Sequence, residues 1–191
     1  MCSFGRVARI LVVLVAAFSV PAAAQLPNYG VGRTPTRAEI EVWDLTIPFD
    51  GAGLPPGRGT VAQGQTIYTE RCASCHGPNG EDPKYNRLVG GRGTLATAQP
   101  IKTIGSLWPY APTLWSYIRR AQPLDEPGSL SVDQVYAVTA YLLHLNGIIG
   151  AHDVLDAKTL PQVRMPNRDG FVLDSRPDVG KTSPSQSRSD R

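Results

Sequence analysis

Two cysteines and a histidine at the spacing Cys-x-x-Cys-His are the residues of this chain best suited to chemistry. Cys72 and Cys75 are separated by two residues, and His76 follows directly. Each thiol can add to one vinyl group of a haem, and the histidine then lies under the iron as its proximal axial ligand. The motif therefore predicts one covalently attached haem of the c type, held by Cys72, Cys75 and His76.

Two other chemistries use paired cysteines, and the rest of the chain supports neither. A zinc site needs two more Cys or His ligands at suitable spacing. Beyond the N-terminal leader, only His144 and His152 remain. A thioredoxin-type redox pair needs a βαβ pattern near the cysteines, and the flanking sequence lacks one.

The first 24 residues have the pattern of a secretory signal peptide. Arg6 and Arg9 form a basic start, and residues 10–20 form an apolar core that is short for a bilayer-spanning helix. A run of alanines at 22–24 supplies the small-residue cleavage site. We predict a cleaved signal peptide at residues 1–24, and an uncleaved membrane anchor is the alternative.

Export and haem attachment support each other. Cleavage would remove Cys2, so every cysteine left in the mature chain belongs to the haem motif. Because c-type haem is attached on the far side of the bacterial inner membrane, we expect a periplasmic protein with no membrane span after cleavage. Removal of Arg6 and Arg9 lowers the formal charge from +3 to +1, so the charge does not support binding to nucleic acid.

The exported chain of about 167 residues is predicted to form one domain between two irregular segments. Residues 25–59 are rich in Pro and Gly, and we expect an extended arm or linker there. This arm is either a flexible tether or a segment that packs on a partner through Trp43. Residues 60–171 form the haem domain, and the polar residues 172–191 are predicted to be a disordered tail.

Three helices are predicted within the haem domain. The first covers residues 61–71 and leads into the haem motif. The second covers residues 113–121, with Thr113 as its N-cap. The third covers residues 131–145 and begins with the Ser-x-x-Gln capping box of residues 131–134.

The first and third helices are expected to cross. Gly64 leaves space for the close approach of a second helix. Tyr141 is placed to meet the helix that carries Gly64 and Tyr68. The third helix has an inward-facing stripe of four apolar residues, Val135, Val138, Leu142 and Leu145.

This order of elements resembles class I cytochrome c, in which a helix runs into the haem motif, a middle helix follows, and a last helix crosses the first. The resemblance covers about residues 60–147. It implies an all-α fold with long loops and, in this chain, an extended N-terminal arm. It also implies that the haem is wedged between the helices with one edge outward.

The second axial ligand departs from the pattern of that family. Class I cytochromes typically carry a methionine followed by a proline just before the last helix, whereas this chain has Gln122-Pro123 there. Apart from the initiator, the only methionine is Met165, which lies after the last helix. We predict Met165 as the distal ligand, because a thioether sulfur raises the potential as an electron carrier requires. The alternatives are His144, His152, an open sixth site, or a Met165 that only fills the core.

Two residues in the loops have open interpretations. Arg92 either donates hydrogen bonds to a haem propionate or is an ordinary solvated arginine. Trp108 either borders the haem or packs in the core.

Several stretches resemble a narrower family, the cytochrome subunits of periplasmic molybdenum sulfur dehydrogenases. The stretches are residues 88–91, 108–110, 117–121, 140–149 and 165–171. The resemblance spans about residues 38–178. The haem subunits of sulfane dehydrogenases from the thiosulfate-oxidising Sox system are the most similar, and those of sulfite dehydrogenases are nearly as similar. Members can carry a second haem domain, whereas this chain has a single haem motif.

That resemblance implies an electron-transfer subunit rather than a catalyst on its own. The haem would take single electrons from a molybdenum-containing dehydrogenase subunit and pass them to a downstream c-type cytochrome. No residue is predicted to be catalytic, while Cys72, Cys75, His76 and Met165 bind the cofactor, the last two as iron ligands. The alternatives are a free electron shuttle for another dehydrogenase and a peroxidase-like haem enzyme with an open distal site.

Overall fold

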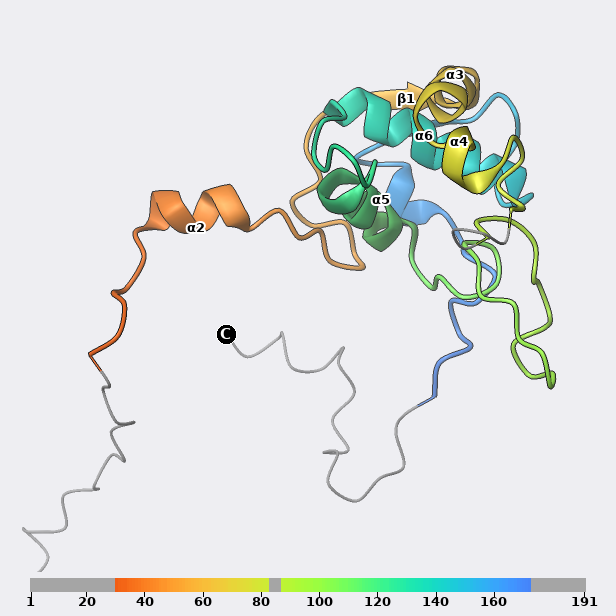
Figure 1. Ribbon diagram of the computed structural model, residues 1–191, viewed down its shortest axis with the longest axis horizontal. Helices are drawn as coiled ribbons and strands as arrows, with labels where there is room; N and C mark the ends of the chain where they lie inside the picture. The colour runs from red at the N-terminus through yellow and green to blue at the C-terminus, as the bar shows by residue number, and fades with distance from the viewer. Residues whose placement is uncertain (1–29, 83–86, 173–191) are drawn as a thin grey trace, which may run out of the picture. The chain divides into compact units, whose positions relative to one another are not determined.

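The computed structural model describes residues 30–82 and 87–172 (Figure 1). The predicted signal peptide at residues 1–24, and the predicted tail beyond residue 172, lie outside the described residues. The chain divides into two units, residues 1–40 and 41–191. Within the described part, none of the helices has both the length and the apolar character that a membrane crossing requires.

A short helix, α2 (Arg37–Trp43), lies in the segment for which the sequence analysis predicts an extended arm. The Thr36 N–H donates to the Glu39 carboxylate (2.8 Å), and the Glu39 N–H donates to the Thr36 hydroxyl (3.3 Å). This reciprocal pair is a capping box, which satisfies backbone donors at a helix start. The arm is therefore not extended throughout, and the Thr-x-x-Glu sequence is the local reason.

Helix α3 (Val61–Arg71) has the predicted bounds and ends at the haem motif. It also begins with a capping box. The Gln63 N–H donates to the Thr60 hydroxyl (3.2 Å), and the Thr60 N–H donates to the Gln63 carboxamide oxygen (3.0 Å). A well-capped start fixes the residue at which the helix begins. It therefore also fixes the position of the cysteines that follow the last turn of the helix.

A small antiparallel ribbon, which the sequence analysis does not predict, precedes α3. Strand β1 (Arg58–Thr60) pairs with strand β2 (Val154–Asp156), with Gly59 opposite Leu155. The ribbon lies against the last long helix at Gly59, where a Cβ would come within 2.1 Å of the Ala137 nitrogen. Each strand has only three residues, too few for an alternating pattern to be recognised in the sequence.

Two further helices complete the domain. Helix α5 (Ala111–Ala121) begins two residues before the predicted start, and its N-cap is Tyr110. The prediction of Thr113 as N-cap was wrong, because Thr113 lies inside the helix and its hydroxyl donates to the Tyr110 carbonyl (2.8 Å). Helix α6 (Val132–Leu145) has Ser131 as its N-cap and the predicted capping box.

Helices α3 and α6 cross as predicted, and Figure 1 shows them side by side. A Cβ on Gly64 would lie 1.9 Å from the Ala137 carbonyl oxygen, so the two backbones touch there. The rings of Tyr68 and Tyr141 pack with their centroids 5.3 Å apart. The close approach at Gly64 brings these two large side chains together in the core.

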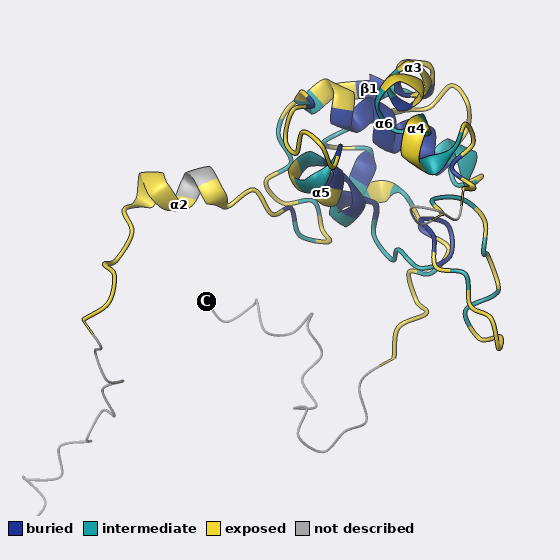
Figure 2. Cartoon of the chain, in the orientation of Figure 1, coloured by how far each residue is buried: buried dark blue, intermediate teal, exposed yellow. Residues whose placement is uncertain are grey.

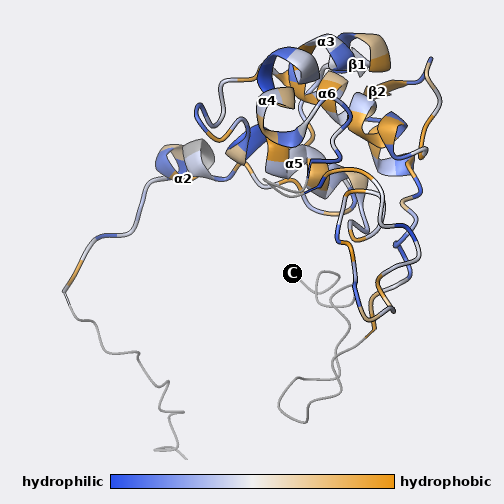
Figure 3. Cartoon of the chain, turned by 45° about the vertical axis from the view of Figure 1, so that its right-hand side comes forward, coloured by the Kyte–Doolittle hydropathy of each residue, from blue (hydrophilic) through white to orange (hydrophobic). Residues whose placement is uncertain are grey.

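Helix α6 is buried more completely than one stripe would require (Figure 2), and hydrophobic residues lie along it (Figure 3). Three of the four predicted stripe residues are buried, and Leu145 is half-buried. Tyr136, Thr139 and Leu143 are each 0% exposed as well. Helices α3 and α5 and the ribbon all pack on α6, so it is covered on several sides.

Candidate haem-binding site

The three residues of the haem motif lie on a single turn of helix. Cys72 caps the short helix α4 (Ala73–His76), which contains Cys75 and His76. The N–H groups of Cys75 and His76 donate to the Cys72 carbonyl at 3.1 and 3.0 Å. The structure thus brings all three predicted residues together directly after α3.

Both thiols of the motif are free, and no disulfide joins them. Cys72 is half-buried, whereas Cys75 is exposed. Burial raises the pKa of the Cys72 thiol to about 11, and the nearby Arg71 charge offsets this only in part. Two reduced thiols beside a histidine are the donor set that thioether attachment and axial ligation need, so these residues fit a covalently bound haem.

The turn after His76 is fixed by hydrogen bonds from two directions. Gly77 ends α4 at a φ of +77°, a conformation that favours glycine. Its carbonyl accepts from the Gly80 N–H (3.3 Å) and from the Tyr68 hydroxyl (2.7 Å). The Tyr68 bond joins α3 to the residue that follows the predicted iron ligand, and helical periodicity in the sequence gives no sign of it.

The loop that contains residues 88–92 is hydrogen-bonded to the residue at the end of α6. The N–H groups of Leu88 and Val89 donate to the Gly80 carbonyl (2.8 and 3.1 Å), and the Asn146 carboxamide donates to the Leu88 carbonyl (3.1 Å). Arg92 donates to the Asn146 carbonyl (3.0 Å). Arg92 therefore has a protein partner that neither of its two interpretations includes.

Two aromatic side chains pack on each other beside α5. The half-buried Trp108 ring packs 5.7 Å from the ring of Tyr117. The Gln122 carboxamide donates to the Tyr117 hydroxyl (3.3 Å). Gln122, which stands where class I cytochromes carry methionine, thus has a local partner in this structure.

Met165 comes from a separate segment and is 1% exposed. The 3-10 helix η2 (Leu160–Gln162), just before it, packs on α5. Just after it, the Asn167 carboxamide donates to the Leu107 carbonyl (2.9 Å). The segments on either side of Met165 thus contact α5 and the loop that precedes α5, and Met165 itself belongs to the buried core.

The two alternative histidines differ in their surroundings. His144 is half-buried, and its Nδ1 lies 3.3 Å from the Ile149 carbonyl oxygen. His152 is exposed in a turn. Neither has the enclosed position that Met165 has.

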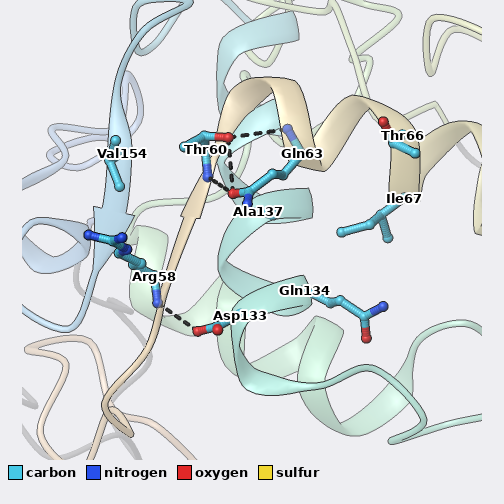
Figure 4. Close-up of a pocket in the computed structure, with 9 residues that line it drawn as sticks. All are labelled: Arg58, Thr60, Gln63, Thr66, Ile67, Asp133, Gln134, Ala137 and Val154. Carbon is cyan, nitrogen blue, oxygen red and sulfur yellow. Dashed lines mark hydrogen bonds between the residues drawn. The ribbon is translucent and has the colours of Figure 1, made fainter.

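A hollow of about 770 Å³ lies between the ribbon, α3 and α6 (Figure 4). Its lining includes Arg58, Gln63 and Asp133, and the Asp133 carboxylate accepts from the Arg58 N–H (2.8 Å). None of the four predicted haem-binding residues lines it. A largely apolar macrocycle does not suit such a polar lining, so we do not assign the haem to this hollow.

Two comparisons with known proteins found matches for this chain. A family model described as Cytochrome c matches residues 61–146, from the start of α3 to the end of α6. A chain in the crystal structure of the sulfane dehydrogenase SoxCD from Paracoccus pantotrophus is 43% identical, with a TM-score of 0.71. The match covers 78% of this chain and 74% of that chain. A search of curated proteins gave no match.

Identity and coverage at this level place the two chains in one family. The comparisons confirm the predicted fold, the predicted resemblance to a sulfane dehydrogenase chain, and the predicted cofactor. Cytochromes c carry haem c covalently, and one Cys-x-x-Cys-His motif corresponds to one haem. The chain belongs to the class I c-type cytochromes, a family of electron-transfer proteins.

Proposed function

We propose that this chain is the monohaem electron-transfer subunit of a periplasmic molybdenum-containing sulfane or sulfite dehydrogenase. The observation that carries the proposal is a complete haem motif on α4 in a chain 43% identical to a chain of a sulfane dehydrogenase. When bound, the haem supplies an iron that accepts and releases one electron at a time. The electron donor is the molybdenum subunit, and the acceptor is a downstream c-type cytochrome.

The residues of α4 hold the cofactor in this proposal. Cys72 and Cys75 bind the macrocycle through thioether bonds, and His76 is the proximal iron ligand. Backbone hydrogen bonds from Cys75 and His76 to the Cys72 carbonyl support a fixed geometry for all three. An electron-transfer site benefits from such rigidity, because the positions of the iron ligands then change little between the two oxidation states.

Met165 is the distal ligand in this proposal. Its burial at 1% exposure on a segment packed against α5 supports this assignment over the exposed His152. With both axial positions filled, no substrate needs to reach the iron. Tight binding of carbon monoxide or cyanide would instead favour the peroxidase-like alternative, with its open distal site.

The N-terminal arm favours a dedicated subunit over a free shuttle. Trp43 is 85% exposed at the end of α2, and Leu45 is 45% exposed just beyond it. Large exposed apolar side chains, tryptophan above all, are common anchors in protein interfaces. The catalytic subunit is the partner that we expect to cover them.

Purification from the native host tests the proposal. A C-terminally tagged chain should be isolated with haem bound, with its N-terminus at Gln25 after signal cleavage, and together with a molybdenum protein in equal amount. An unrelated exported protein with the same tag controls for non-specific retention. A haem-bearing chain that is isolated alone, from cells that make the dehydrogenase, would favour the free shuttle.

A further inference from the structure

The hydroxyl of Tyr68 contacts the backbone beside the predicted iron ligand. Tyr68 lies on α3, one helical turn before Cys72, and is 0% exposed. Its hydroxyl donates to the Gly77 carbonyl at 2.7 Å. The other donor to this carbonyl, the Gly80 N–H, is farther away at 3.3 Å. The tyrosine therefore makes the shorter of the two bonds that hold the Gly77 carbonyl.

The Tyr68 ring is itself held in place by the core. It packs on the ring of Tyr141 from α6, at a centroid distance of 5.3 Å. One turn earlier on α3, Gly64 touches the α6 backbone at Ala137. The ring cannot shift without disturbing this helix crossing, so the hydroxyl is a fixed point for the turn at Gly77.

The backbone on both sides of His76 is hydrogen-bonded. The His76 N–H donates to the Cys72 carbonyl (3.0 Å), and the His76 carbonyl accepts from the Asp82 N–H (3.2 Å). The carbonyl of the next residue, Gly77, is held by Tyr68. The direction of a side chain follows the φ and ψ angles of its backbone. Because Gly77 follows His76 directly, a shift of the Gly77 backbone would act on the backbone that sets the direction of the His76 ring.

We propose that Tyr68 is a positioning residue for the proximal ligand. Its hydroxyl fixes the Gly77 carbonyl and so sets the orientation of the His76 imidazole at the iron. This inference rests on the role of His76 in the proposed function. A tyrosine hydroxyl is protonated at neutral pH, so it is a hydrogen-bond donor there.

Tyr136 provides a matched control for Tyr68. It is also 0% exposed, its hydroxyl also donates to a backbone carbonyl, that of Pro55 (3.0 Å), and its ring also packs on an aromatic ring, that of Trp115 (5.2 Å). Tyr68→Phe and Tyr136→Phe thus remove the same group from similar surroundings. Only Tyr68→Phe removes a hydroxyl that is hydrogen-bonded to the residue next to the haem motif.

The test compares the two holoprotein variants with the wild type. The hyperfine-shifted haem methyl resonances of the ferric protein report the orientation of the axial ligands, and the midpoint potential gives a second readout. We expect Tyr68→Phe to change the order or spread of the methyl resonances and to shift the potential, and Tyr136→Phe to leave both unchanged. An unchanged Tyr68→Phe, or an equal change in both variants, would overturn the inference.

Wild-type holoprotein gives a second test that does not depend on folding of the variant. The Tyr68 hydroxyl proton should exchange slowly with water and show a nuclear Overhauser effect to the Gly77 backbone. Rapid exchange, like that of an exposed tyrosine, would overturn the inference even if Tyr68→Phe yielded no holoprotein. A wild-type haem without a histidine ligand would overturn the proposed role of His76, an outcome distinct from an unchanged Tyr68→Phe.

Discussion

The two cysteines proposed to bind the haem, Cys72 and Cys75, lie in different surroundings. Cys72 is half-buried, and its pKa is raised to about 11, whereas Cys75 faces solvent. A protonated, half-buried thiol is a poor nucleophile by itself, because the thiolate is the reactive form. Attachment at Cys72 therefore benefits from a haem that is already held next to α4.

Serine replacements should separate the two thioether bonds. We expect the exported wild-type chain to exceed its polypeptide mass by one haem, each single variant to keep haem through one bond, and Cys72→Ser/Cys75→Ser to carry no covalent haem. Intact mass and the pyridine haemochrome spectrum measure this. Cys2→Ser is the control and should change neither, since Cys2 lies in the predicted signal peptide.

Replacement of Met165 tests the distal ligand. Met165→Leu conserves volume, which keeps the cost to stability under roughly 1.5 kcal/mol while the sulfur is removed. We expect the ferric protein to lose its methionine–iron charge-transfer band and the ferrous protein to gain carbon monoxide binding. Gln122→Ala should keep the band. A band that survives in Met165→Leu would show that another group ligates the iron.

The buried tyrosines predict how stability depends on pH. Burial raises the pKa of Tyr68 and of Tyr136 to about 12, above the ordinary value of about 10. Both must stay neutral in the folded state, so their contribution is fully present below about pH 10 and is lost as the pH rises towards 12. The free energy of unfolding of the holoprotein in urea should begin to decline at about pH 10, and the decline should be shallower in Tyr136→Phe. If the free energy of unfolding of Tyr136→Phe declined as steeply as that of the wild type, groups other than Tyr136 would cause the decline.

The crossing of α3 and α6 depends on the absence of a side chain at Gly64. A Cβ there would lie 1.9 Å from a backbone oxygen, which cannot rotate away as a side chain can. Gly64→Ala should therefore destabilise the holoprotein by about 1–3 kcal/mol or more, despite the better helix propensity of alanine. Urea unfolding measures this.

Gly150→Ala is the control for that variant. Its Cβ would meet no atom closer than 3.5 Å, from Asp153, and its φ does not require glycine. We expect it to change the free energy of unfolding by less than about 0.5 kcal/mol. Equal effects of the two substitutions would argue against a tight contact at Gly64.

The ribbon connects two distant parts of the chain next to the helix crossing. Strand β1 leads into α3, and β2 leads through η2 towards Met165. Their pairing holds the C-terminal segment beside the start of α3. The ribbon thus helps to keep the proposed distal ligand in a fixed position relative to the helices.

Helices with both an apolar pattern and a capping signal were predictable from sequence. The predicted 61–71 helix is α3 to the residue, and the capping box at Ser131 starts α6 as expected. Where a signal was weaker, the prediction was less accurate. Helix α5 begins at Ala111 without a side-chain cap, and α2 has a capping box but only seven residues.

The haem motif could be predicted because its residues are adjacent in sequence. The side chains that hydrogen-bond to the backbone near the motif could not be predicted, because they reach their partners only in the folded chain. Tyr68 reaches the Gly77 carbonyl across the end of α3, and Arg92 reaches Asn146 across 54 residues. Such contacts depend on the exact path of the loops, which hydrophobic periodicity does not determine.

The exposed tryptophan of the arm gives a prediction for the whole assembly. Trp43→Ala should leave the haem spectrum and the unfolding of the domain unchanged, because Trp43 is 85% exposed. It should weaken retention of the catalytic subunit during purification. Val154→Ala, at a 41% exposed apolar residue on β2, is the control. If both variants retained the catalytic subunit equally well, Trp43 would have no part in docking.

Stopped-flow spectroscopy measures electron transfer from the catalytic subunit to the haem. The ferric cytochrome is mixed with its molybdenum subunit and a sulfane or sulfite substrate, and the ferrous haem absorbance is followed. We expect one electron to be taken up per chain, only when both the subunit and the substrate are present. A haem that stays ferric under those conditions, while a chemical reductant reduces it readily, would contradict the proposed function.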